Sequence, residues 1–140
     1  MTRVVIDTNV VVSSLLTTGS PKEILDLAFN KQFAWYVSDS ILAEYESVFN
    51  YAHLKITAMA IRNTMAKIRK VAHLVSPMVT ISESTDIDDN RFLECAQAAK
   101  ANYLVTGNLR HFPSTWKYAK VVPPKEFLRL WQMQKPLHRR

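Results

Sequence analysis

Residues 3–9 read Arg-Val-Val-Ile-Asp-Thr-Asn, and they give the first indication of the fold class. Its apolar part, Val4-Val5-Ile6, is a run of β-branched residues that is typical of a strand buried on both faces of a parallel sheet. The run ends abruptly at Asp7. Because ligands bind at the carboxyl ends of strands in an open parallel sheet, Asp7 is a candidate functional carboxylate. The alternative is that Asp7 only caps a turn.

Strand and helix patterns alternate along the rest of the chain. Further strands are predicted at residues 33–37, 79–81 (an edge strand), 103–105 and 121–122. Helices are predicted at residues 21–30, 38–50, 56–73 and 88–101, with a last helix after Pro123-Pro124 that runs through Trp131. This alternation predicts an α/β fold of three layers, α/β/α, with a central parallel sheet of four to five strands.

Length and composition predict one cytoplasmic domain. A chain of 140 residues with 48% hydrophobic content can bury one stable core. We expect a single domain over residues 1–134, a polar loop over residues 82–86 and a disordered basic tail over residues 135–140. The single cysteine, Cys95, fits a reducing compartment, and the apolar stretch at residues 4–16 is interrupted by Asp7 and Asn9, which makes it a poor signal peptide. No segment approaches a membrane-spanning length.

The charge balance favours a polyanionic partner. Eighteen Lys and Arg residues against 12 Asp and Glu residues give a net charge of +6, which suits nucleic acid, although a solvated basic surface explains it too. Candidate contacts to an RNA backbone are Arg62, Arg69 and His73 on one side of the long helix, and Arg139 and Arg140 in the tail. A solvated surface is the alternative for both groups.

Glu44 is an unusual carboxylate because it lies on an apolar helix face. It follows Ile41 by three residues and precedes Val48 by four, whereas Glu46 on the same helix falls outside this stripe. Glutamates are seldom buried unless they are paired or bind a metal. Glu44 is therefore a candidate ligand, or a side chain that reaches solvent at the rim.

Asp86, Asp88 and Asp89 cluster at the start of the helix predicted at residues 88–101. Acidic residues are favoured there by the helix dipole, which explains most of the cluster. Asp89 differs because it shares a face with Phe92 and Ala96, so it is expected to point toward the sheet, and Asp88 away from it.

Four polar groups are thus expected at one edge of the sheet: Asp7, Glu44, Asp89 and Asn108, which follows the strand at residues 103–105. Three carboxylates would repel one another without a cation, and Mg²⁺ or Mn²⁺ prefers oxygen ligands. Such ions can bind a phosphate and activate water, so hydrolysis of a phosphodiester is the reaction that this set favours.

Other cofactor sites are not supported. With two glycines, Gly19 and Gly107, the chain has neither a dinucleotide fingerprint nor a P-loop. The four histidines and one cysteine lack zinc-site spacing. His111 is a candidate phosphate contact, with a structural or solvated histidine as the alternative.

The order of these motifs resembles the PIN domain family over residues 4–130. The matching motifs are Val5-Ile6-Asp7-Thr8-Asn9-Val10-Val11, Ser38 through Glu44, Asp89-Asn90-Arg91-Phe92-Leu93-Glu94-Cys95-Ala96, and Thr106-Gly107-Asn108 with His111-Phe112. The likeness is greatest to the PIN toxin components of bacterial and archaeal toxin-antitoxin systems.

The resemblance implies a function and a site. PIN nucleases cleave single-stranded RNA with Mg²⁺ or Mn²⁺, form homodimers and are inhibited by an antitoxin. Asp7, Glu44 and Asp89 match the three core acidic positions that hold the metal. Thr8 and Asn9 match the residues that brace the first aspartate, and Thr106 matches a frequent hydroxyl at the exit of the fourth strand.

Asn108 departs from the family pattern, because these relatives usually carry a fourth aspartate there. An amide oxygen can ligate a hard cation but adds no charge, so a second ion is expected to bind more weakly. The alternative function is therefore a catalytically weak PIN module that binds RNA or a protein partner. A phosphoacceptor signalling domain is disfavoured, because Thr8-Asn9 follow Asp7 where a second acid would be needed.

A homodimer is also expected from the apolar residues of the second and third helices. Leu27, Tyr45 and Phe49 exceed what one small sheet obviously needs to cover it. The alternative is that these side chains belong to the core.

Overall fold

The computed structural model describes residues 1–81 and 87–134, and it has a mostly parallel sheet at its centre. The strands are β1 (Arg3–Ile6), β2 (Ala34–Val37), β3 (His73–Leu74), β4 (Tyr103–Val105), β5 (Thr115–Trp116) and β6 (Ala119–Val122). Their order in the described sheet is β3-β2-β1-β4-β6-β5. All neighbours are parallel except β5, which pairs antiparallel with β6. The expected α/β fold is confirmed, with β5 as an additional antiparallel edge strand.

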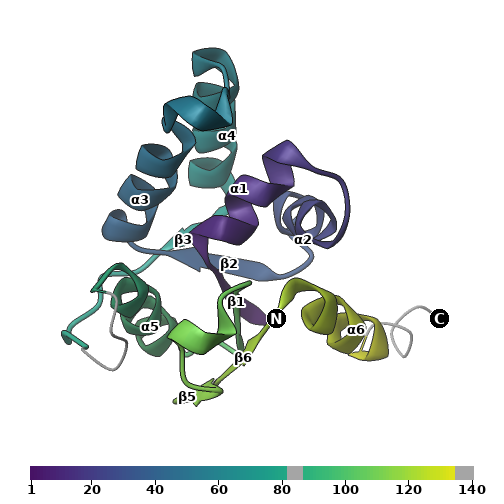
Figure 1. The fold of residues 1–140 in the computed structure, drawn as a ribbon. Coiled ribbons are helices and arrows are strands. Elements are labelled where there is room, and N and C mark those ends of the chain that lie inside the picture. Colours follow the sequence, from purple (N-terminus) through teal and green to yellow (C-terminus); the bar gives the residue numbers. More distant parts are fainter. Residues whose placement is uncertain (82–86, 135–140) are drawn as a thin grey trace.

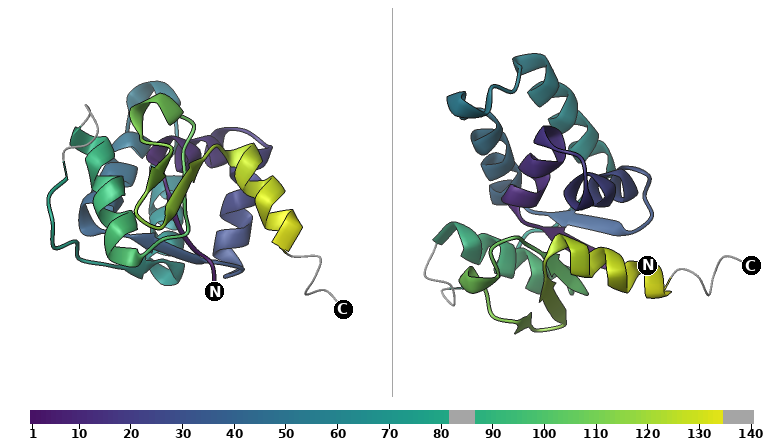
Figure 2. Two further views of the ribbon diagram at one scale, coloured as in Figure 1. Left: turned by 90° about the horizontal axis from the view of Figure 1, so that it is seen from below. Right: turned by 45° about the vertical axis from the view of Figure 1, so that its right-hand side comes forward.

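Helices cover both faces of this sheet (Figure 1). They are α1 (Thr8–Leu16), α2 (Ser20–Phe29), α3 (Asp39–Phe49), α4 (Ala58–Val71), α5 (Ile87–Ala99) and α6 (Pro124–Gln134), with short 3-10 turns at Ala52–Leu54 and Leu109–His111. Helix α5 packs against β1, β2 and β4, while α6 lies on the other side, next to α2 and β4. Helices α3 and α4 extend away from the sheet beside α1 (Figure 2).

The core is continuous from one helical layer to the other. Val4, Val5 and Ile6 of β1 have no exposed surface, as expected for a central parallel strand. Beyond the sheet, Phe33 meets the rings of Phe127 and Trp131 edge-on, at centroid distances of 5.5 and 5.8 Å. These contacts fix α6 against the sheet.

Helix α1 was not predicted from the sequence. It begins directly after β1, with Asp7 as its N-cap, and it buries the apolar side chains of residues 10–12. The Asp7 side chain accepts a hydrogen bond from the backbone N–H of Thr8 at 2.8 Å. Both interpretations of Asp7 are therefore compatible, because the capping residue also lies at the carboxyl edge of the sheet.

The predicted edge strand at residues 79–81 is wrong. The strand at the β2 edge of the described sheet is β3 at His73–Leu74, whose residues pair with Tyr36 and Val37 of β2. Helix α4 correspondingly ends at Val71, before the expected end at His73. His73 therefore lies outside the helix and does not share a face with Arg62 and Arg69. Its ring stacks on Tyr36 instead, with centroids 5.0 Å apart.

Two of the side chains on which the homodimer expectation rested belong to the core. Tyr45 and Phe49 have no exposed surface, and Leu27 packs partly buried against the same core. The premise that they exceed the needs of the fold is wrong, because α3 packs on both α1 and α4.

The loop at residues 82–86, the side chain of Asp88 and the tail at residues 135–140 lie outside the described residues. Across residues 1–81 and 87–134, no helix is long and apolar enough to cross a membrane.

Candidate metal and phosphate site

A pocket of about 630 Å³ lies at the carboxyl edge of the sheet. Its walls come from the β1–α1 junction, α3, the start of α5 and the turn after β4. Seven of the eight residues predicted for the site line it: Asp7, Thr8, Asn9, Glu44, Asp89, Asn108 and His111. The eighth, Thr106, is fully buried beneath the pocket and contacts Asp7. The structure thus brings together residues that are up to 104 positions apart between Asp7 and His111.

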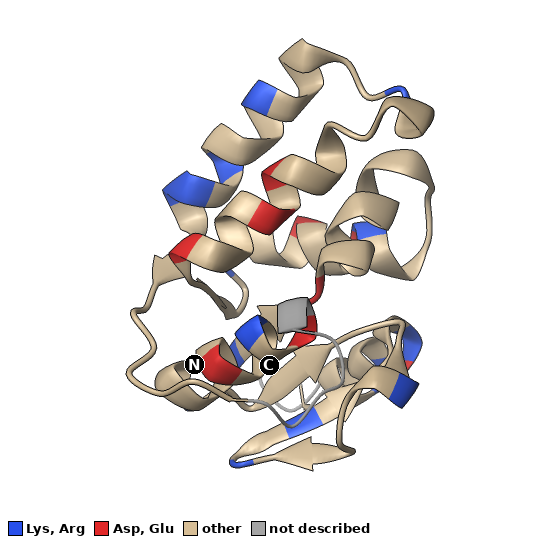
Figure 3. Ribbon diagram, turned by 60° about the vertical axis from the view of Figure 1, so that its left-hand side comes forward, with Lys and Arg blue, Asp and Glu red and all other residues tan. Residues whose placement is uncertain are grey.

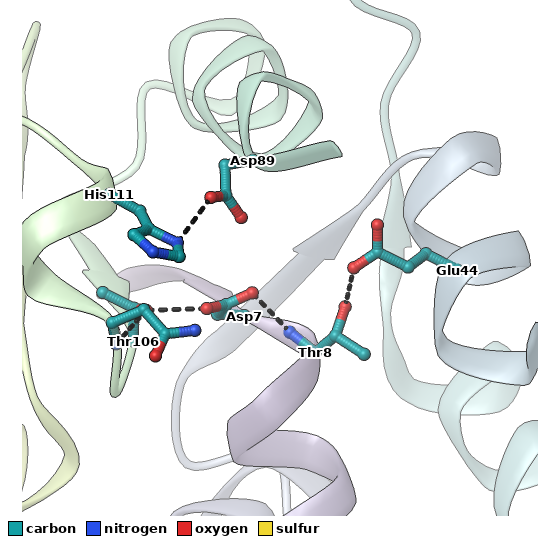
Figure 4. Close-up of polar contacts among 7 residues, drawn as sticks. Asp7, Thr8, Glu44, Asp89, Thr106 and His111 are labelled. Carbon is teal, nitrogen blue, oxygen red and sulfur yellow. Dashed lines mark hydrogen bonds and ion pairs between the residues drawn. The ribbon is translucent and has the colours of Figure 1, made fainter. Parts of the chain in front are cut away.

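Asp7 is held at both carboxylate oxygens (Figure 4). Oδ1 accepts from the backbone N–H of Thr8, and Oδ2 accepts from the Thr106 hydroxyl at 2.6 Å. Thr106 Oγ1 itself accepts from the backbone N–H of Asn108 at 2.9 Å. Because that bond occupies a lone pair of the hydroxyl, the Thr106 proton is directed at Asp7. The side chain of Asp7, which is 3% exposed, is therefore fixed in the pocket wall.

Glu44 joins the site through Thr8. The Thr8 hydroxyl donates to Glu44 Oε2, so the first turn of α1 lies between the carboxylates of Asp7 and Glu44 (Figure 4). Glu44 is half-buried, as its place in the apolar stripe predicts, whereas Glu46 is exposed. The expected contrast between the two glutamates is confirmed.

Asp89 faces the pocket from the first turn of α5. It is 8% exposed, and Phe92 and Ala96 on the same helix face are buried, as predicted. Its Oδ2 lies 3.0 Å from Nδ1 of His111 (Figure 4). The tautomer of His111 with a proton on Nδ1 can donate to this carboxylate.

These oxygen donors fit Mg²⁺ or Mn²⁺ by their chemistry, since both ions take carboxylates, amide oxygens and retained water. They do not form a ready-made cage: within residues 1–81 and 87–134, no group of three or more His, Cys, Asp or Glu side chains is close enough to hold an ion. The hydrogen bonds of Glu44 to Thr8 and of Asp89 to His111 occupy carboxylate oxygens that an ion would use. The residues therefore match a divalent metal ion in the type of their donor atoms.

Sequence reasoning missed part of the pocket wall. Ser40 and Ser47 line the pocket beside Glu44 from the same face of α3, and Tyr51 lines it just beyond the end of that helix. Arg91 lines it from α5, two residues after Asp89. The helical period from Glu44 was the signal that could have found Ser40 and Ser47, whereas Arg91 lies off the period of Asp89.

The basic residues of α4 lie elsewhere. Arg62, Lys67, Arg69 and Lys70 are exposed on a helix without acidic residues (Figure 3). Lys67 Nζ lies 4.3 Å from the centroid of the Phe29 ring, and Arg69 pairs with Glu46 at 3.7 Å. None of the four is among the residues that line the pocket.

An α/β fold with an acidic pocket at the carboxyl ends of its strands is an architecture suited to metal-assisted phosphate chemistry. The PIN domain family matches residues 3–110. This match ends before β6 and α6, so it is shorter than the expected resemblance over residues 4–130. The chain therefore belongs to the PIN domain family, a nuclease-type family whose members typically depend on a divalent metal. It is 35% identical over 141 residues to an uncharacterized protein of Methanocaldococcus jannaschii, with 90% of this chain and 89% of that protein covered.

Proposed function

We propose that this protein is a divalent-metal-dependent endoribonuclease that cleaves single-stranded RNA. The observation that carries the proposal is the convergence of Asp7, Glu44, Asp89 and Asn108, from four separate parts of the chain, on one pocket. Membership of a nuclease-type family supports it.

The residues of the pocket have different roles in the proposed reaction. Asp7, Glu44 and Asp89, with the amide oxygen of Asn108, would hold Mg²⁺ or Mn²⁺. The bound ion supplies Lewis-acid polarisation of a phosphate and lowers the pKa of water. Thr8 and Thr106 keep Asp7 in place through the hydrogen bonds described above. His111 orients Asp89 and lies half-exposed at the pocket, where it meets a substrate phosphate.

A cleavage assay on single-stranded RNA tests the proposal. We expect the purified protein to cleave RNA with Mg²⁺ or Mn²⁺ and to be inactive with chelator. The Asp89→Asn variant should cleave about 100-fold more slowly, or slower still. Glu46→Gln is the matched control, because Glu46 is an exposed carboxylate on the helix that carries Glu44. Activity that survives in Asp89→Asn would identify a contaminating nuclease and contradict the proposal.

Asn108 favours a second candidate function, in which the domain binds RNA or a protein partner and cuts poorly. The pocket has a neutral amide where related PIN domains usually carry an acid, so its total negative charge is smaller. RNA binding without metal-dependent cleavage in the same assay would support this second function.

A role as the toxin of a toxin-antitoxin pair is the biological form of the first proposal, with a cognate antitoxin and a homodimer as partners. Induced expression should arrest growth of a bacterial host, and Asp89→Asn should relieve the arrest. Light scattering at micromolar concentration tests the homodimer, and a monomer mass contradicts it. Because Tyr45 and Phe49 are core residues, such an interface must use other side chains.

A further inference from the structure

Arg91 is the one permanently cationic side chain among the described residues that line the pocket, which also holds the carboxylates of Asp7, Glu44 and Asp89. An RNA phosphate that enters this pocket brings further negative charge. A guanidinium on the wall offsets the repulsion, and its planar fork matches phosphate geometry.

The position of Arg91 is fixed by two hydrogen bonds in series. Its Nη2 lies 2.8 Å from Oε2 of Glu94, one helical turn further along α5. The same oxygen of Glu94, a residue only 7% exposed, accepts from the backbone N–H of Ile81 at 2.9 Å. The guanidinium is therefore preorganised, which lowers the entropic cost of binding a ligand.

The pairing with Glu94 leaves donor capacity on the guanidinium. The group has five N–H bonds, and the structure commits Nη2 to Glu94. Its Nε is buried and has no hydrogen-bond partner in the described part of the chain. A guanidinium present only to neutralise Glu94 would not need to line the pocket, yet the Arg91 side chain retains 28% exposure there.

We propose that Arg91 binds a backbone phosphate of single-stranded RNA in the pocket and that Glu94 positions its guanidinium. The proposal rests on the proposed function for its substrate class. It adds to the site a substrate contact that is independent of the metal.

Binding of a fluorescent single-stranded RNA oligonucleotide, followed by anisotropy in the presence of chelator, tests the proposal without cleavage. We expect Arg91→Gln to bind about tenfold more weakly. The slope of log affinity against log salt concentration should fall in magnitude by about 0.7, the value for one phosphate contact on a single strand. The glutamine amide can still donate to Glu94, so the local fold is retained.

Arg129→Gln is the matched control. Arg129 pairs with Glu126 at the same spacing of three residues, on α6 and outside the pocket lining, and its loss removes the same net charge. Equal affinities and equal salt slopes for Arg91→Gln and Arg129→Gln would overturn the proposal, as would wild type that does not bind RNA.

Arg91→Lys keeps the test decisive if Arg91→Gln does not fold. It retains the charge without the fork, so we expect the wild-type salt slope with weaker binding. A lysine variant equal to wild type in affinity would overturn recognition by the guanidinium. Cleavage of the same oligonucleotide with Mn²⁺ separates the two proposals. If the salt slope of binding depends on Arg91 but the protein never cleaves the RNA, the proposed nuclease activity is refuted and the phosphate contact is upheld.

Discussion

Asn108 has an amide side chain where the resemblance to PIN domains implies a carboxylate, and its backbone contact allows the side chain to be changed with little disturbance. Its backbone N–H donates to Thr106, and a change of side chain leaves this bond in place. We expect Asn108→Asp to raise Mn²⁺ affinity several-fold and to increase RNA cleavage at limiting Mg²⁺, because a charged oxygen joins the donor set at nearly constant size. Calorimetry and the cleavage assay measure the two effects.

Asn63→Asp is the control, since it adds the same charge on the exposed face of α4, outside the pocket lining. If Asn108→Asp behaves like this control in both measurements, Asn108 is only a turn residue and no ligand.

At the same scale, the sequence predicted those site residues that break a local pattern. Glu44 is a carboxylate in an apolar stripe, and Asp89 lies on the buried face of its helix, so helical period alone separated Glu44 from Glu46 and Asp89 from Asp88. Arg91 and Glu94 break no pattern, because an Arg and a Glu three residues apart are ordinary on a helix surface. Only the tertiary contact between Glu94 and Ile81 distinguishes this pair from an ordinary surface ion pair.

Among the elements, the chain at Ile81 is tied to helix α5 through Glu94. In Glu94→Ala the Ile81 N–H and the Arg91 guanidinium lose their shared acceptor. We expect the variant to lose about 1–3 kcal/mol of unfolding free energy, because buried donors are left unsatisfied. The Ile81 amide should also exchange its hydrogen faster. Urea unfolding and hydrogen exchange measure the two quantities.

Glu126→Ala on α6 removes the acid of an exposed Arg–Glu pair with the same spacing, and it should leave stability nearly unchanged. Equal losses in Glu94→Ala and Glu126→Ala would contradict the role assigned to Glu94.

Helix α1 and strand β3 show why some elements were missed. The sequence of α1, Thr-Asn-Val-Val-Val-Ser-Ser-Leu-Leu, contains few strong helix formers, and it forms because Asp7 caps it and residues 10–12 enter the core. Strand β3 has two residues, both exposed, and it exists only through its pairing with β2. Neither cause is visible in local composition, whereas β1, β2 and β4 have apolar runs that predicted them.

The core of the described molecule holds a thiol and a phenol, those of Cys95 and Tyr45, that ionise only in alkali. Burial raises the pKa of the Cys95 thiol to about 12 from an ordinary 9.0 and raises the pKa of Tyr45 well above its ordinary value. Above about pH 9 the unfolded chain releases the Cys95 proton while the folded protein retains it. The free energy of unfolding should therefore fall from about pH 9 toward pH 12, by up to about 1.4 kcal/mol per pH unit from Cys95.

Urea unfolding at several pH values between 7 and 11 measures this dependence. Cys95→Ala should flatten the fall between pH 9 and 10, before Tyr45 contributes, whatever its effect on stability at neutral pH. A variant whose stability declines with the same slope as wild type would show that Cys95 is not the source.

Asp7 ends the central strand, starts α1 and belongs to the pocket, and this sharing has a genetic consequence. Its two oxygens hold the N–H of Thr8 and the hydroxyl of Thr106, so a mutation at Asp7 removes a structural contact together with a charge. Loss-of-function alleles at this codon would lower the amount of folded protein as well as its activity, and the two causes could not be separated in a cell. Asp89 also loses a contact when it is mutated, because its carboxylate pairs with the half-exposed His111, so the amount of folded protein has to be measured for alleles at that codon as well.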